Sequence, residues 1–214
     1  MFEKGEGTKP NHKRAIKWYR LAAKNGNSLA QYNLGLIYEK GERIRRNFAK
    51  AFKWYLKAGN LGNAEAQLKL AQIYDRGNDN VKKDIKKAIK WYVSSAKQGK
   101  VQAQLRLAKI YEKGSWIEKN FYHAVKWYKA AADKGSLEAQ SRLGLHYIHG
   151  KGVKKNFTKA IYWFHKAAKR GDPKAQYNLG LLYEKGDGVS KNLRKAVKWY
   201  LMAAEQDHKK AQAN

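Results

Sequence analysis

The sequence predicts an all-α fold built from a repeated two-helix unit, because three features recur along its 214 residues at one spacing. They are a Trp, an Ala-Gln pair, and a Tyr followed three residues later by Gly. Successive copies of each lie 36 or 37 residues apart. The Trp stands at Trp18, Trp54, Trp91, Trp127, Trp163 and Trp199. Such a period is typical of arrays in which each unit packs on its neighbours.

The first helix of each unit, helix A, is predicted from stretches such as SLAQYNLGLIYEKG at 28–41. Its apolar residues Ala30, Leu34, Ile37 and Tyr38 share one face at helical spacing. The Gly that follows each Tyr marks the end of helix A. One insertion, in the loop GNDNVKKD at 77–84, accounts for the single spacing of 37, since loops tolerate added length.

The second helix, helix B, is predicted from stretches such as NFTKAIYWFHKAAKRG at 156–171. A residue that can cap the free N–H groups of the first turn precedes each copy, and a Gly that can adopt a left-handed conformation ends it. The capping residues are Asn11, Asn47, Asp84, Asn120, Asn156 and Asn192. The terminating residues are Gly26, Gly62, Gly99, Gly135 and Gly171.

The motif AIKWY at 15–19, repeated at 88–92, combines a cation with two aromatic residues. On a helix that advances about 100° per residue, Trp18 and Tyr19 fall in one apolar arc with the flanking alanines, while Lys17 points away. We therefore predict that the repeated Trp and Tyr are packing residues of helix B, and that the motif is no nucleic-acid signature.

The composition excludes several classes of protein. The 13% aromatic content argues against disorder, and no run approaches the ~18–20 apolar residues that a transmembrane helix needs. Cysteine is absent, which excludes disulfides and thiolate metal sites. The net charge of +29 attracts anionic partners. However, 36 of the 46 cations are Lys and only 10 are Arg, the residue favoured for bidentate phosphate recognition.

The unit GDPKAQYNLGLLYEKGDGVSKNLRKAVKWYLMAA at 171–204 resembles the Sel-1-like repeats, relatives of the tetratricopeptide repeats. The resemblance covers essentially the whole chain, with small departures such as Gly59, Ser95 and Asp207. It implies a right-handed α-solenoid of antiparallel helix pairs that serves as a non-catalytic scaffold for proteins or peptides, of a kind that occurs widely in bacteria.

The expected organisation is a single repeat array over residues 1–214, with a partial repeat at 1–26 and another at 208–214. The complete repeats are expected at 27–62, 63–99, 100–135, 136–171 and 172–207. Because no polar caps are visible, we expect a longer array, a partner element or oligomerisation at the ends. No signal peptide is visible in the first residues, and the compartment stays unknown.

If helices A line the concave surface, as the resemblance implies, polar positions opposite their core face form columns along a groove. We predict that this groove binds an acidic or extended peptide segment of a partner, with Asn bonding its backbone and cations its carboxylates. The predicted binding residues are Asn33, Lys69, Arg106, Lys109, Arg142 and Asn178. A further column carries Lys40, Arg76, Lys113, His149 and Lys185. Exposed helix positions also favour Lys and Arg without any ligand.

Two other functions remain open from the sequence. The basic surface could bind RNA, DNA or another polyanion, with Tyr32, Tyr177 and the loop residue Trp116 as candidate stacking platforms. The chain could also be an architectural spacer within a larger protein. No catalytic constellation or cofactor motif is visible. The pair His146 and His149 has a metal-compatible spacing but lacks an acidic third ligand nearby, so we predict no metal site and interpret His146 as a packed core residue.

Overall fold

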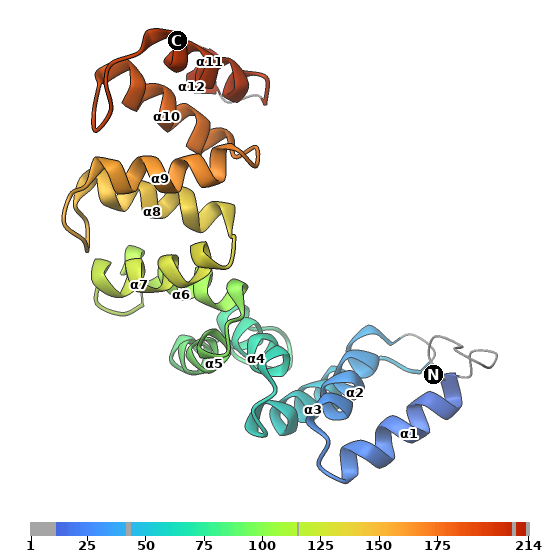
Figure 1. The fold of residues 1–214 in the computed structure, drawn as a ribbon. Helices are drawn as coiled ribbons and strands as arrows, with labels where there is room; N and C mark the ends of the chain where they lie inside the picture. Colours follow the sequence, from blue (N-terminus) through green and yellow to red (C-terminus); the bar gives the residue numbers. More distant parts are fainter. Residues whose placement is uncertain (1–11, 42–43, 115, 207–208, 213–214) are drawn as a thin grey trace. The chain divides into compact units, whose positions relative to one another are not determined.

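The computed structural model describes residues 12–41, 44–114, 116–206 and 209–212. Within these ranges, apart from an isolated bridge between Asn78 and Val81, the regular elements are all helices (Figure 1). They are α1 (His12–Lys24), α2 (Ser28–Lys40), α3 (Phe48–Asn60), α4 (Ala64–Arg76), α5 (Ile85–Lys97), α6 (Val101–Lys113), α7 (Phe121–Asp133), α8 (Leu137–His149), α9 (Phe157–Ala168), α10 (Pro173–Lys185), α11 (Leu193–Ala204) and α12 (Lys209–Gln212). The predicted all-α fold of packed helix pairs is confirmed.

The helices fall into two compact units, residues 1–103 and 104–214. In the first unit, α1 to α5 pack in succession, each helix against the next. In the second, α7 to α12 do the same, and α6 joins them through contacts described below. Helices A are α2, α4, α6, α8 and α10, and the odd-numbered helices are helices B.

The caps that the sequence predicts for helix B are present. Asn47 and Asn156 lie in extended conformation before α3 and α9, and the side-chain oxygen of each accepts the N–H three residues on at 2.8 Å. Asp84, Asn120 and Asn192 do the same, while Asn11 lies outside the described residues. The five glycines that follow helices B all have a φ between 83° and 88°.

Small residues let the helices of a pair approach closely. Ala51, Ala88, Ala124 and Ala160 on helices B are fully buried. On helices A, Gly144 faces the ring of Phe164, and a Cβ added there would lie 2.6 Å from a ring carbon. Buried rings therefore press against the backbone of helix A, and this contact sets the spacing of the pair.

The two aromatics of the Trp-Tyr motif have different environments. Tyr55, Tyr92, Tyr128 and Tyr200 are buried, as the helical arc predicts. The Trp beside each of these four Tyr is only half-buried. Of the other two, Trp163 is 6% exposed and Trp18 is 56% exposed. The prediction that the repeated Trp are packing residues is wrong for Trp18. Other Trp are covered by a neighbouring repeat: Trp54, for example, packs on the cluster of Ala23, Ala30 and Leu34 in the preceding helix pair.

Candidate interaction surface on the helices A

In the first unit, three successive helices meet at the carboxylate of Glu39. The hydroxyl of Tyr55 on α3 donates to Glu39 Oε2 on α2 at 2.6 Å. The ammonium of Lys69 on α4 lies 3.0 Å from the same oxygen and 3.3 Å from Oε1. Burial opposes ionisation of Glu39, but these two donors outweigh it and lower the pKa of the carboxyl below its usual value. Burial and the carboxylate together raise the pKa of Tyr55. We call this arrangement the acid–tyrosine–cation group.

The second unit repeats the group around Glu112 on α6. Tyr128 of α7 donates to Glu112 Oε2 at 2.7 Å, and Arg142 Nη1 of α8 lies 3.7 Å from Oε1. His146 Nε2 approaches the same Oε1 at 3.5 Å. The His146 side chain, then Tyr128 and Arg142, lower the pKa of Glu112 to about 2 although burial acts in the opposite direction.

His146 is 3% exposed and occupies a position that is Ile or Leu in the other helices A. Its Nδ1 lies 2.7 Å from the carbonyl oxygen of Lys151, so Nδ1 carries a hydrogen and donates it. The rings of Phe121 and Tyr128 pack against the imidazole at 5.9 and 5.6 Å. The interpretation of His146 as a packed core residue agrees with this environment.

The acid–tyrosine pair recurs in two further repeats. Tyr92 donates to Asp75 at 3.0 Å, and Tyr200 donates to Glu184 at 2.6 Å. One repeat lacks the group altogether: Ile148 stands at the acid position, Phe164 at the tyrosine position and Asn178 at the cation position. The acid and the tyrosine are thus replaced together, whereas Asn also stands at the cation position in other repeats, as at Asn33. The acid–tyrosine pair therefore acts as one unit that joins successive repeats.

The predicted binding residues are therefore already engaged within the chain to a large extent. Lys109 on α6 pairs with Glu138 on α8 at 2.7 Å. The amide of Asn178 donates to the carbonyl of Lys174 on its own helix at 2.7 Å. Asn33 on α2 and Arg106 on α6 are half-buried. Asn33 and Lys69 belong to the first unit and the other four residues to the second, so each unit presents its own part of the column.

The sequence did not reveal the carboxylates that hold these cations. A helical wheel places Lys69 or Arg142 on its own helix but says nothing of which residue the neighbouring helix brings beside it. The signal that could have revealed the acid–tyrosine pair is the joint replacement at Ile148 and Phe164 when the repeats are compared.

Exposed cations remain at the last turn of three helices A. Arg76, Lys113 and Lys185 are exposed, and none has a carboxylate partner among the described residues. They belong to the second column that the sequence indicates. Lys40 and His149 are also exposed, and they complete that column.

A second repeated contact occupies many of the lysines and tyrosines that could otherwise bind nucleic acid. In four helices A, the Tyr near the end carries a Lys from the first turn of the following helix B over its ring. In α6 the corresponding Tyr111 stacks on His123 instead. Lys87 lies 5.4 Å from the ring centre of Tyr74, and Lys195 lies 5.3 Å from that of Tyr183. The carbonyl of the same Tyr accepts the N–H of the capping residue, as in Asp84 to Tyr74 at 2.8 Å. These contacts fix the loop between the two helices.

The candidate stacking residues lie in different settings. Tyr32 and Tyr177 are half-buried, with ring centres 5.9 and 5.6 Å from Tyr55 and Tyr200. Trp116 in its loop is 54% exposed. Among the described residues, no three His, Cys, Asp or Glu side chains gather as metal ligands would. The same part of the chain holds no helix with the length and apolarity to span a bilayer.

Comparison with known proteins identifies the repeat. The Sel1 repeat family matches residues 1–27, 28–63, 64–100, 101–136, 137–172 and 173–208. No curated protein sequence matches the chain.

Two solved structures share the fold over most of this chain. One is a protective antigen of uropathogenic Escherichia coli that displays an SLR fold, with 32% identity and a TM-score of 0.89 over 99% of this chain and 45% of the antigen. The chain therefore spans less than half the length of that antigen. The other is a Sel1 repeat protein from Oxalobacter formigenes, with 32% identity and a TM-score of 0.77 over 90% of this chain and 82% of that protein. The chain belongs to the Sel1 repeat family.

Proposed function

We propose that this chain is a protein-interaction scaffold that binds an acidic or extended segment of a partner protein along its helices A. Sel1 repeats commonly serve as protein-interaction scaffolds and are generally non-catalytic. The proposed contacts are Asn33 and Lys69 in the first unit and Arg106, Lys109, Arg142 and Asn178 in the second.

The observation that carries the proposal is a repeated cation at equivalent positions of helices A, each beside a carboxylate that also accepts a tyrosine hydroxyl. Lys69 and Arg142 are fixed by Glu39 and Glu112, so little side-chain freedom is lost when a ligand binds. The side chain of Arg142 remains 43% exposed. A guanidinium has five N–H donors, and its Nη1 lies 3.7 Å from Glu112 Oε1, beyond hydrogen-bond distance, which leaves donors for a partner carboxylate.

The exposed Arg76, Lys113 and Lys185 add further cations on helices A, outside the acid–tyrosine–cation groups. Because they have no carboxylate partner among the described residues, their charge is not offset locally. Together with the net charge of +29 they attract an acidic segment and raise its association rate.

The proposal is tested with acidic and neutral extended peptides selected from a displayed library on the full chain, their affinity measured by fluorescence anisotropy at physiological salt. The variant Arg106→Gln/Arg142→Gln should lose about tenfold or more in affinity, because charge-assisted hydrogen bonds disappear. A matched variant, Lys126→Gln/Lys198→Gln, removes the same charge from exposed positions on helices B and should lose much less.

Equal losses in the two variants would contradict a defined site on helices A, because charge alone would then explain binding. Circular dichroism controls for the helical fold of each variant. Competition by poly(U) that persists at about 0.5 M NaCl would favour the nucleic-acid alternative, since phosphate contacts weaken steeply with salt. Failure of the unmodified chain to bind any peptide would favour the spacer alternative.

A further inference from the structure

The repeated Trp of helix B is covered by the helix pair that precedes it in the chain. Trp91 on α5 packs on the cluster of Ala51, Tyr55, Leu70 and Ile73 from α3 and α4. Trp199 on α11 packs on the cluster that contains Phe164 and Leu179 from α9 and α10. The same contact therefore joins consecutive repeats in both units.

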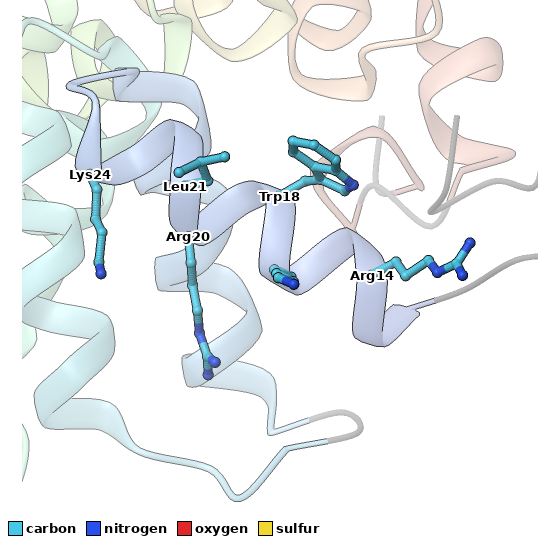
Figure 2. A pocket seen from close by; sticks show the side chains of 6 residues that line it. Arg14, Trp18, Arg20, Leu21 and Lys24 are labelled. Carbon is cyan, nitrogen blue, oxygen red and sulfur yellow. The ribbon is translucent and has the colours of Figure 1, made fainter.

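Among the residues that the structure describes, no helix pair covers Trp18 on α1, which is 56% exposed. Leu21, one turn further on, is 50% exposed, and Figure 2 shows both side chains on the same side of α1 while Arg20 and Lys24 point away. Leu21 is not a routine feature of the repeat. The corresponding residues of the other helices B are Lys57, Ser94, Ala130, Lys166 and Met202.

A surface hollow of about 580 Å³ lies against this face of α1. Among the described residues it is lined by Trp18, Leu21 and four cations. These cations are Arg14, Lys17, Arg20 and Lys24. The lining of the hollow thus combines two large apolar side chains with four cations, and aromatic residues and Arg are the types that protein interfaces favour.

A surface of the kind on which the repeated Trp packs is exposed on α11. Leu193, Val197 and Leu201 follow one another at intervals of four residues and are 57%, 54% and 58% exposed. At this helical spacing they form one apolar stripe.

The corresponding stripe of other helices B is where the Trp of the following repeat is seated. On α9 it consists of Phe157, Ile161 and His165, and the His165 ring lies 5.5 Å from the ring of Trp199. On α3, Leu56 lines one hollow together with Trp91 of α5. The stripe on α11 therefore has the chemistry and position of a seat for a Trp of a further helix B.

We propose that two copies of this chain associate head to tail, with Trp18 and Leu21 of one copy seated on Leu193, Val197 and Leu201 of the other. The argument is one of continuity: each copy carries both halves of a contact that already recurs between its own repeats. Because the two surfaces differ, the contact is heterologous and leaves one free surface of each kind on every dimer. Association then continues to larger assemblies.

The charge of both surfaces sets the conditions under which the copies associate. Arg14, Lys17 and Lys24 line the hollow on α1, and Arg194 and Lys198 are exposed beside the α11 stripe. These cations repel one another at low salt. Lysines in the lining do not prevent the contact, because Lys87 and Lys90 line the hollow that Leu56 and Trp91 share. Association should therefore strengthen as salt is added, the opposite of polyanion binding.

The test is sedimentation velocity of the full chain over a range of concentrations at about 0.5 M NaCl, where the Debye length is below about 5 Å. The weight-average mass should rise with concentration beyond that of one chain. Two variants, Trp18→Ser/Leu21→Ser and Val197→Ser/Leu201→Ser, should each remain monomeric. Both change exposed residues without changing charge, so circular dichroism should show an unaltered fold.

An equimolar mixture of the two variants gives the sharpest outcome. Each variant retains one intact surface, so the mixture should form a dimer and nothing larger. The control variant Tyr122→Ser/Tyr162→Ser removes two exposed aromatics elsewhere and should associate like the unmodified chain. A chain that stays monomeric at every concentration, a variant that still self-associates, or a mixture without dimer would overturn the proposal.

Discussion

At the scale of single residues, Phe164 shows that the acid and the tyrosine that join neighbouring repeats depend on each other. A buried tyrosine hydroxyl needs an acceptor, and a partly buried carboxylate needs donors. Tyr128 and Glu112 satisfy each other at 2.7 Å. Where the hydroxyl is missing, at Phe164, the carboxylate is missing too and Ile148 takes its place. The replacement is coherent because an isolated member of the group would be buried without a partner.

The first prediction concerns this dependence. Phe164→Tyr should lower the free energy of unfolding by about 1–3 kcal/mol, since the new hydroxyl meets Ile148 in place of an acceptor. Adding Ile148→Glu should recover part of that loss by rebuilding the acid–tyrosine pair. Urea denaturation of the two single variants and the double variant measures the coupling. Strictly additive effects would show that the two positions do not act together.

The second prediction follows from the pKa of Glu112. This pKa, about 2, lies below the ordinary carboxyl value of 4.5, so the ionised group stabilises the fold above about pH 4.5. The contribution is lost as the pH falls through the pKa of the folded state. The difference in free energy of unfolding between the chain and Glu112→Gln should therefore shrink between about pH 5 and pH 2. We expect a change of about 1–2 kcal/mol, less than the full shift implies because the carboxylate is partly exposed.

Urea denaturation across that pH range provides the measurement. The matched variant is Glu118→Gln, which alters an exposed carboxylate with no ion pair among the described residues. Parallel stability curves for the chain and Glu112→Gln would contradict the assignment of Glu112 as a stabilising anion.

At the scale of elements, the sequence predicts the helices well because their signals are local. The stretch at 28–41 corresponds to α2 (Ser28–Lys40), and the stretch at 156–171 to α9 (Phe157–Ala168). Asn156 caps α9 from outside, which is why the helix begins one residue later. Periodicity, caps and glycines are read within a few residues of each other, so tertiary packing has little occasion to override them.

The burial of the Trp column could not be predicted in the same way. A helical arc says that Trp18 and Trp54 face the same direction, but it does not say whether another helix pair lies there. Trp54 is covered by residues of α1 and α2, whereas Trp18 is exposed. The same limit applies to the candidate site. The position of Lys69 on its own helix predicts it as a site residue, whereas its partner Glu39 is recognised only once the neighbouring helices are packed together.

At the scale of the whole molecule, two electrostatic effects act in opposite directions. The ion pairs of the described residues, among them Lys69 with Glu39, Lys100 with Glu65, and Lys109 with Glu138, stabilise the fold and are weakened by salt. The excess of 46 cations over 17 acidic residues destabilises the compact state through repulsion, and salt screens this too. Partly exposed pairs contribute little each, roughly 0–1 kcal/mol. We therefore expect repulsion among the 29 excess charges to dominate.

The last prediction is that NaCl stabilises this protein. Raising NaCl from about 20 mM to 500 mM shortens the Debye length from more than 20 Å to below 5 Å, and the urea midpoint should rise accordingly. A variant with Lys17, Lys53, Lys126 and Lys198 changed to Gln removes four exposed charges from equivalent positions of helices B. It should be more stable at low salt and should respond less to added NaCl, because less repulsion remains to be screened. A midpoint that falls with NaCl would show instead that the ion pairs between repeats outweigh the net charge. The acid–tyrosine–cation groups would then be the principal electrostatic support of the array.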